Sequence, residues 1–343
     1  MNCKTFSLSE VVETVIDNRG LTPKKLGGDW SDGGYRVISA KNIKNRSLVQ
    51  EDKIRTIDDS LYSRWMDEDI HKGDIILTSE APCGETLFWD SDEKIVLGQR
   101  LFGIRVKKGY DPYYLFLYLN TRGFQNELSS RMTGTTVQGI RQSELMKCRL
   151  TLPSYDVQVA VTKQIKPIDD LIRLNDRIND YLFEIGRTVF IHFQNTHSTS
   201  KCHLSDTADI MMGQSPPGES YNVEGKGTLF FQGRAEFGQY FPTPNLYTDQ
   251  PKRLASKGDI LMSVRAPVGD INIAIDDCCI GRGLAAIRSN VGCQSYLHYL
   301  IDSMKSDFDQ YNGTGTVFGS INKNEMNSIM MLSLIHISEP TRP

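Results

Sequence analysis

Three short segments contain residue types that are used in catalysis, but each lacks a residue that its chemistry requires. In Ser215-Pro216-Pro217-Gly218, the nearest match to an amino-methyltransferase motif, glycine replaces the aromatic ring that would stack on an extruded base. A phosphate-binding loop around Lys226 would need glycine at 220 and serine or threonine at 227, where the chain has Ser220 and Gly227. Asp92-Glu93-Lys94 has the wrong spacing for a nuclease that binds magnesium through Asp and Glu-x-Lys. We therefore expect no enzyme activity and no cofactor.

Cysteine and histidine residues form no pattern that would hold a metal. The seven cysteines have no Cys-x-x-Cys spacing and are odd in number, and the six histidines are scattered along the chain. A disulfide framework needs paired cysteines, and a zinc site needs closely spaced ligands. We expect reduced thiols and no bound metal.

A set of short motifs occurs twice, about 185 residues apart. Lys72-Gly73-Asp74-Ile75 precedes Glu80-Ala81-Pro82, and Lys257-Gly258-Asp259-Ile260 precedes Arg265-Ala266-Pro267. The repeating units of solenoid proteins span only about 20–50 residues. A repeat of this length predicts two similar domains instead.

The motifs lie in the same order within each copy. A Gly-x-Thr/Ser-Pro turn comes first, and a short apolar strand follows at 35–38 in one copy and 228–231 in the other. The Lys-Gly-Asp-Ile segments predict a tight turn before a buried strand, with positive φ at glycine and with Asp bound to turn amides. A Gly/Thr loop at 133–140 or 313–321 then precedes a helix. We expect two repeated α/β modules of the mixed α+β class.

Between the modules the sequence predicts one long amphipathic helix. Apolar residues recur at spacings of three and four, which is typical of a coiled-coil-like seam. The central residues of this stripe are Leu171, Leu174, Ile178, Tyr181, Leu182 and Ile185. Pro167 should kink or interrupt the helix, because proline lacks an amide donor and clashes with the preceding turn. A helix with such a stripe needs a partner helix.

These elements divide the chain into four regions. We place the first module at 6–153, the long helix at 154–196, the second module at 197–332 and a tail at 333–343. The tail resembles a translated sequencing adapter, so we expect it to be non-native and the natural protein to continue into another helix.

The composition is that of a soluble globular protein. The 343 residues can form two cores, and 39% of them are hydrophobic and 24% charged. No secretion signal or run of about 18 apolar residues is present, so we expect a cytoplasmic location. The net charge is −3, yet residues 51–93 include 13 acidic and 4 basic side chains, whereas 100–150 include 9 basic and 3 acidic. Only the second stretch is suited to face an anion, unless both are simply solvated surface.

In their order and duplication, the motifs resemble the DNA specificity (S) subunit of type I restriction-modification systems. The resemblance covers about residues 6–331. It implies two target recognition domains, each of which reads one half of a split sequence in double-stranded DNA. It also implies a noncatalytic scaffold whose helical region binds two methyltransferase (M) subunits, joined by restriction and translocase (R) subunits. The family has a second long helix that this sequence lacks, which puts its coiled coil and assembly in question.

Side chains that read DNA must lie on loops beside the strands. Lysine and arginine supply contacts to phosphate, while arginine, asparagine and glutamine discriminate base edges. Two matched arginines, Arg100 and Arg282, are either phosphate contacts or internal ion pairs. In the Gly/Thr loops, which we match at Gly139 and Gly319, small residues allow close approach to phosphate, although a purely structural turn is equally compatible. The DNA-binding candidates are Lys41, Asn42, Lys44, Asn45, Arg46, Arg100, Thr135, Thr136, Gln138, Arg141 and Gln142 in the first module, and Gln232, Arg234, Arg282, Thr314, Thr316, Ser320, Asn322 and Lys323 in the second.

Two other classes of protein remain alternatives. A standalone methyltransferase or a nuclease-fused specificity protein would need a cofactor glycine loop and an aromatic residue after Pro-Pro, and this sequence has neither. A nonenzymatic binding module for another polyanion or for carbohydrate would be served equally well by two repeated domains.

Overall fold

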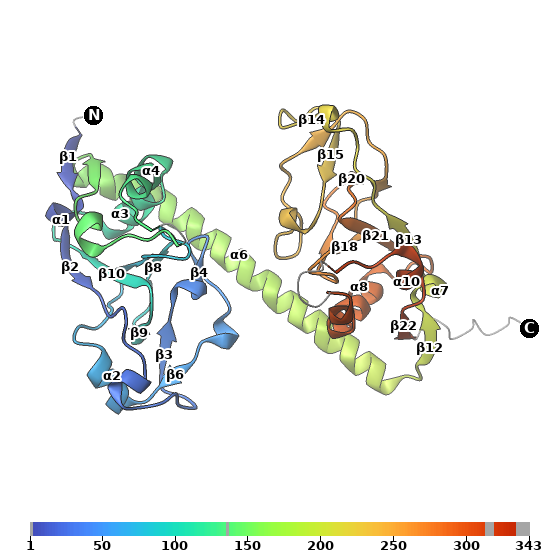
Figure 1. Cartoon of the computed structure of the whole chain (residues 1–343), viewed down its shortest axis with the longest axis horizontal. Coiled ribbons are helices and arrows are strands. Elements are labelled where there is room, and N and C mark those ends of the chain that lie inside the picture. The colour runs from blue at the N-terminus through green and yellow to red at the C-terminus, as the bar shows by residue number, and fades with distance from the viewer. Residues whose placement is uncertain (1–2, 135–136, 313–318, 334–343) are drawn as a thin grey trace, which may run out of the picture. The chain divides into compact units, whose positions relative to one another are not determined.

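The computed structural model describes residues 3–134, 137–312 and 319–333. Four DNA-binding candidates, Thr135, Thr136, Thr314 and Thr316, lie outside the described residues, as does nearly all of the expected tail. The chain divides into two compact units, residues 1–175 and 176–343, and the long helix α6 contributes one half to each (Figure 1).

The first unit contains two small sheets and two separate strand pairs, β1–β11 and β4–β5. A four-stranded antiparallel sheet has the order β2-β10-β7-β8, and a three-stranded sheet has the order β6-β3-β9, in which β3 and β9 run parallel. The elements are β1 (Lys4–Ser7), α1 (Leu8–Val11), β2 (Val12–Ile16), β3 (Tyr35–Ile38), β4 (Ile43–Lys44), β5 (Ser47–Leu48), β6 (Thr56–Ile57), α2 (Asp59–Trp65), β7 (Ile75–Thr78), β8 (Thr86–Phe88), β9 (Ile95–Leu97), β10 (Leu101–Val106), α3 (Pro112–Leu119), α4 (Arg122–Ser130), α5 (Gln142–Leu145) and β11 (Arg149–Leu152).

The second unit repeats the four-stranded sheet, the outer pair and the parallel pair, but its second sheet has five strands in the order β14-β16-β15-β20-β17. Its four-stranded sheet has the order β13-β21-β18-β19, and β15 and β20 form the matching parallel pair. The elements are β12 (Ser200–His203), α7 (Leu204–Thr207), β13 (Ala208–Met212), β14 (Tyr221–Asn222), β15 (Thr228–Phe231), β16 (Tyr247–Thr248), β17 (Leu254–Ala255), β18 (Ile260–Ser263), β19 (Ile271–Ile273), β20 (Cys278–Ile280), β21 (Leu284–Ser289), α8 (Gln294–Ser303), α9 (Lys305–Phe308), α10 (Lys323–Asn327) and β22 (Met330–Ser333).

The apolar run after each Lys-Gly-Asp motif is a strand buried on both faces. In β7, Ile75 and Leu77 belong to a core formed with α3 and α4, while Ile76 belongs to a second core shared with the three-stranded sheet. Successive side chains of a strand point to opposite faces, so a strand between two cores must be apolar throughout. In β18, Met262 and Leu261 are divided between two cores in the same way. The predicted buried strand is therefore confirmed in both copies.

The aspartate of each motif holds the turn together. Asp74 accepts a hydrogen bond from the His71 amide at 2.8 Å, and Asp259 accepts one from the Ser256 amide at 2.8 Å. Each carboxylate also binds an arginine of the neighbouring central strand: Asp74 pairs with Arg105 at 2.8 Å, and Asp259 with Arg288 at 2.7 Å. The preceding glycines have φ of +99° and +87°. The prediction of a glycine turn with Asp bound to turn amides is confirmed.

Helix α6 (Tyr155–Thr196) is continuous through Pro167, so the predicted interruption at that residue is absent. Its 42 residues correspond to about 63 Å at 1.5 Å per residue. All six predicted stripe residues are exposed, with 44–62% of each accessible to solvent. The amphipathic pattern thus leaves an apolar face on α6 that the described residues of the chain do not bury.

Candidate nucleic-acid interface

A cavity lies beyond the carboxyl ends of the parallel strands in each unit. The chain leaves β3 at Ser39 and leaves β9 at Gly98, whose amide donates to the Ile38 carbonyl at 2.7 Å. A Cβ at position 98 would lie 2.8 Å from that carbonyl oxygen, so only glycine permits this approach. In the second unit the Gly281 amide donates to Phe231 at 2.8 Å. The same backbone closure thus precedes both cavities.

The first cavity has a volume of about 410 Å³. Its wall is cationic and aromatic: Lys41, Lys53, Arg55 and Arg100 line it, together with Trp30 and Trp65. The other lining residues are Leu21, Thr22, Pro23, Val37, Ser39, Ala40, Asn42, Ile54, Ala81, Gly98 and Gln99. Two repeated motifs, the Gly-x-Thr-Pro turn and the Ala-Pro turn, therefore contribute to this wall.

The second cavity has a volume of about 470 Å³ and is built from the corresponding segments. Its lining residues are Ser215, Gln232, Gly233, Arg234, Ala235, Glu236, Arg265, Ala266, Arg282 and Gly283. Three of these are arginines, and none is aromatic. The strand frame is shared by the two cavities, but the side chains around them differ.

The hydrogen bonds of the central strands correct the match between Arg100 and Arg282. The Ser79 amide donates to the Arg100 carbonyl at 2.8 Å, and the Val264 amide donates to the Gly283 carbonyl at 2.9 Å. Arg100 therefore corresponds to Gly283, and Arg282 corresponds to Gln99. The sequence match was wrong by one residue, because both segments contain an arginine but at adjacent positions. Both arginines nevertheless line their cavities.

Asn42 lies inside the first unit and is only 1% exposed. Its Oδ1 accepts a hydrogen bond from the Ser39 amide at 3.1 Å, and its Nδ2 donates to the Val49 carbonyl at 3.3 Å. The side chain therefore stabilises the short 3-10 turn at 40–42, and its contact with DNA stays a prediction. In contrast, Lys41 on the same turn is exposed and lines the cavity.

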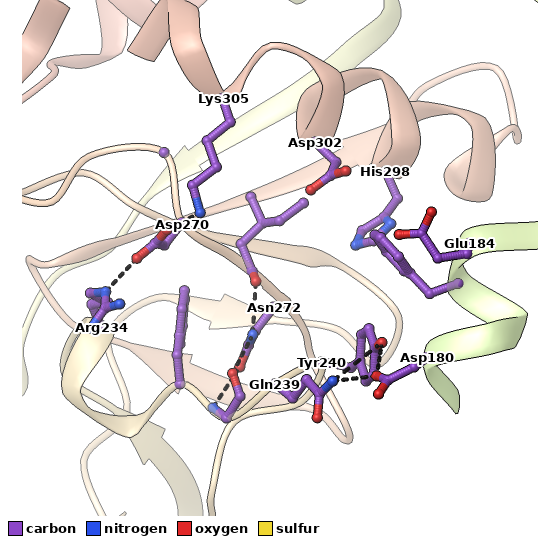
Figure 2. Close-up of a pocket in the computed structure, with 15 residues that line it drawn as sticks. Asp180, Glu184, Arg234, Gln239, Tyr240, Asp270, Asn272, His298, Asp302 and Lys305 are labelled. Carbon is purple, nitrogen blue, oxygen red and sulfur yellow. Dashed lines mark hydrogen bonds and ion pairs between the residues drawn. The ribbon is translucent and has the colours of Figure 1, made fainter. Parts of the chain in front are cut away.

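Arg46, which follows this turn, contacts the helix and does not line the cavity. Arg46 pairs with Asp169 of α6 at 3.1 Å, and the same carboxylate accepts a hydrogen bond from Tyr113 at 2.6 Å. In the second unit, Tyr240 donates to Asp180 of α6 at 2.6 Å (Figure 2). Burial and this hydrogen bond raise the pKa of Tyr240. Arg46 and Tyr240 thus each bind the half of the helix that belongs to their own unit, while Lys44 and Asn45 are exposed beside Arg46.

Two of the predicted arginines form ion pairs at the cavity rims. Arg100 pairs with Glu80 at 3.1 Å, and Arg234 pairs with Asp270, which also binds Lys305 at 2.7 Å (Figure 2). Burial alone would raise the pKa of Asp270, but the bonds from Lys305 and Arg234 together lower it. Both arginine side chains remain about half exposed. The Arg100–Glu80 pair is exposed on both sides, and such a pair contributes only about 0–1 kcal/mol, so Arg100 can exchange its carboxylate for a phosphate at little cost.

The ends of the Gly/Thr loops bridge to the cavity rims. Gly139 forms a β-bridge with Glu80, and Ser320 forms one with Arg265. Gly139 therefore corresponds to Ser320, one residue beyond the Gly319 that the sequence match gave, because the second loop is longer by one residue. The candidates after the bridges are exposed except for the half-buried Gln142; they are Arg141, Gln142, Asn322 and Lys323, with Gln138 just before the first bridge. Asn322 is occupied as the N-cap of α10, where it accepts hydrogen bonds from two amides at 2.9 and 3.1 Å.

The sequence analysis did not predict several residues that line the two cavities. Arg265 carries a signal in the sequence, because it begins the repeated Ala-Pro motif at the position of Glu80, and the bridge to Ser320 places it at the rim. Lys53 and Arg55 had no such signal: they lie in the acidic stretch 51–93 and reach the cavity only because β6 pairs with β3.

The first unit and most of α6 match a known protein family. Residues 2–182 match the family described as Type I restriction modification DNA specificity domain. A putative type I restriction enzyme MjaX specificity subunit of Methanocaldococcus jannaschii is 32% identical over 361 residues, which cover 94% of this chain and 80% of the relative. The chain belongs to the type I restriction-modification DNA specificity family.

Two further similarities agree with this assignment. The MjaVIII specificity subunit of the same organism is 26% identical over 43% of this chain and 36% of its own length. A crystal structure of a type I restriction-modification S subunit from M. genitalium has a TM-score of 0.58 at 14% identity, covering 97% of this chain and 85% of that one. The predicted resemblance and the mixed α/β fold with a long connecting helix are confirmed. As a member of this family, the specificity protein recognises DNA for a type I restriction-modification system.

A further cavity of the specificity protein, of about 530 Å³, lies between α6, α8 and the strands of the second unit (Figure 2). His298 of α8 lines it, with Asp180, Glu184, Asp302 and Lys305 around it. Burial lowers the pKa of His298, although Asp302 acts in the opposite direction. Ten residues beyond the matched arginines Arg105 and Arg288 lie Leu115 and His298, and Leu115 is 1% exposed within the core of the first unit. A buried apolar side chain in the first unit thus corresponds to a half-buried polar one in the second.

Within the described ranges, no helix is long and apolar enough to cross a membrane. The same residues contain no group of three or more His, Cys, Asp or Glu side chains that could hold a metal ion.

Proposed function

We propose that each unit of the specificity protein reads one half of a bipartite DNA target through the cavity at the ends of its parallel strands. The observation that carries this proposal is the matched position of the two cavities together with their different cations. A shared frame with variable side chains is suited to reading two different half-sequences. Lys41, Lys53, Arg265 and Arg282 have no ion-pair partner among the described residues, so they are available to phosphates or base edges.

Exposed cations after the Gly/Thr loops extend this surface. We assign Arg141 and Lys323 to phosphate, and Gln138 and Ser320 to positions beside the rims. Phosphate contacts fix the register of a protein on DNA, while contacts to base edges supply discrimination. Gln99 and Gln232, which line the two cavities, are candidates for the second role because glutamine can form paired hydrogen bonds to adenine.

We further propose that the protein is a noncatalytic scaffold. Its exposed α6 stripe would bind helical partners and support two methyltransferase subunits, to which restriction subunits are added, and α6 would set the spacing between the half-sites. Leu182→Asp in the stripe should abolish co-elution with the methyltransferase subunit in size-exclusion chromatography, whereas Arg187→Ala, at an exposed polar position of the same helix, should not. Unchanged co-elution of both variants would contradict this use of the stripe.

Filter binding of duplex DNA tests the recognition role. From a pool of random duplexes, the protein should retain those that share a bipartite consensus sequence. The selection is run with and without the methyltransferase subunit. Arg265→Ala with Arg282→Ala should relax selection at one half-site, and Lys41→Ala with Lys53→Ala at the other. Lys108, which is exposed in the turn at the far end of β10, provides the control substitution Lys108→Ala. Equal effects of each pair on both half-sites, or binding with no sequence preference, would contradict the proposal.

A further inference from the structure

The first cavity has an electrostatic bias that the net charge of the chain conceals. Its lining includes four cations, Lys41, Lys53, Arg55 and Arg100, and not one carboxylate. Of these cations, only Arg100 has an ion-pair partner among the described residues. Cations that converge without a carboxylate create a positive potential inside a concave site. The ligand of this cavity should therefore carry negative charge.

The same cavity has a flat aromatic wall. The guanidinium of Arg55 lies 3.6 Å from the ring centroid of Trp30, and both residues line the space. A stacked arginine and tryptophan present a planar surface, on which a second aromatic ring can stack. The ligand should therefore contain an aromatic ring as well as an anion.

Trp65 supplies an independent indication of a ligand. It lines the cavity and is 2% exposed, yet its indole Nε1 has no hydrogen-bond acceptor within the described part of the chain. Buried donors are almost always satisfied, and an unsatisfied one calls for an explanation. A ring nitrogen or carbonyl oxygen of a bound heterocycle would provide the missing acceptor.

The second cavity lacks these features. Arg234, Arg265 and Arg282 line it beside Glu236, and no aromatic side chain contributes. It is suited to contact a phosphate chain from the side, but it offers no surface on which a ring could stack. Of the two cavities at the ends of the parallel strands, the aromatic one is that of the first unit.

We propose that the first cavity binds a single nucleotide, with its base against Trp30 and Trp65 and its phosphate against Lys41 and Lys53. The volume of about 410 Å³ lies within the range of about 300–1,000 Å³ found for small-ligand sites. The nucleotide is either a unit of the bound DNA that has left its stack or a free nucleotide that regulates the complex. The proposal rests on the proposed DNA-reading role of this unit and names the ligand of the same site.

Tryptophan fluorescence of the whole chain tests this directly, because two of its three tryptophans line the cavity. Titration with each of the four deoxynucleoside 5′-monophosphates should quench the emission saturably, with a preference for one base. Trp89→Phe should retain this quenching, because Trp89 does not line the cavity. Inorganic phosphate alone should compete only weakly, since it cannot stack.

Charge-removing substitutions at exposed positions keep the test independent of folding. Lys41→Ala with Lys53→Ala should raise the Kd for the preferred nucleotide by roughly tenfold or more, because hydrogen bonds to charged groups contribute substantially to affinity. The control Lys108→Ala should leave the Kd unchanged. Equal affinity of the double variant and the control would overturn the assignment.

Duplex DNA carrying 2-aminopurine separates the two sources of the nucleotide. If the nucleotide belongs to the DNA, 2-aminopurine emission should rise at one position of the half-site read by the first unit, and free nucleotide should suppress the rise. If it is a free regulator, nucleotides should bind without changing 2-aminopurine emission. Absence of both signals, while filter binding still shows a bipartite consensus, would overturn the nucleotide site and leave the DNA-reading role intact. Loss of the consensus itself would instead contradict the proposed function.

Discussion

The two units have the same strands at their cavities but different side chains around them. The parallel pairs β3–β9 and β15–β20 end in the same backbone hydrogen bonds, and the Ala-Pro turns follow matched strands. Two tryptophans and four cations line the first cavity, whereas three arginines and a glutamate line the second. Buried strands and ion pairs fix the frame, because any change there exposes backbone or leaves a charge unpaired. The loops carry no such constraint, so they are free to differ between two readers.

The largest expected effect comes from the frame itself. Asp74→Ala removes a carboxylate that is 3% exposed and leaves Arg105, which is 18% exposed, without its main partner. Breaking a buried ion pair in this way costs about 3–5 kcal/mol. Asp259→Ala should cost less, roughly 1–3 kcal/mol, because Arg288 is 51% exposed and can be solvated. Urea unfolding, with hydrogen exchange of β7 and β18 amides to assign each transition, measures both.

Conservative variants serve as controls for this pair. Asp74→Asn and Asp259→Asn keep an acceptor for the turn amide and should be less destabilising than the alanine variants. If Asp259→Ala destabilised its unit as much as Asp74→Ala does, burial of the arginine would not be what distinguishes the two units.

A second prediction compares a fully buried ring of α3 with the half-buried histidine of α8. Phe116→His should destabilise the first unit by about 1–3 kcal/mol, because the core would then contain a buried polar ring without a partner. His298→Phe should be tolerated, since Phe183 and Tyr299 already pack against this ring. Thermal unfolding of both variants gives the comparison. A destabilised His298→Phe and a neutral Phe116→His would reverse it.

The His298 variant should also change the dependence of stability on pH. Burial lowers the pKa of His298 below its ordinary value of 6.5, although Asp302 opposes the shift, and Asp180, Glu184 and Lys305 share the cavity. Between the two pKa values the unfolded chain binds more protons than the folded chain. The stabilisation is therefore present above about pH 6.5 and is lost as the pH falls through the folded pKa. His298→Phe should flatten this part of the profile, measured as the free energy of unfolding in urea between pH 8 and 5.5; an unchanged slope would exclude His298 as its source.

The third prediction concerns affinity for DNA. Arg141→Ala and Lys323→Ala should each weaken binding and reduce the slope of log K against log salt by about 0.9 for each phosphate that the protein no longer neutralises. Both residues are exposed and have no ion-pair partner among the described residues. Filter binding at several salt concentrations measures both quantities, with Lys108→Ala as the control. Unchanged affinity and slope in both variants would remove the loops from the interface.

The central strands and their turns could be predicted from the sequence because a strand buried on both faces is apolar along its length. The apolar runs after Asp74 and Asp259 and the glycine turns before them were both readable, as was the periodicity of α6. The residues of the candidate site were harder to predict from the sequence. Arg46 and Asn42 were indistinguishable from surface readers in the sequence, since their partners, Asp169 and Val49, come together only in the fold. Lys53 and Arg55 line the first cavity because β6 pairs with β3, and no local sequence pattern indicates this pairing.

The smallest expected effect tests how each unit holds its half of α6. Arg46→Ala removes a partly exposed ion pair with Asp169, but Tyr113 still donates to that carboxylate, so the loss should not exceed about 1 kcal/mol. Tyr240→Phe removes one hydrogen bond to Asp180, while Gln239 remains bound to the same oxygen. Hydrogen exchange of α6 amides should therefore rise only slightly and only in the half that belongs to the substituted unit. Because Arg46 acts on the helix, its substitution should leave the salt slope of DNA binding unchanged, and a reduced slope would return it to the interface.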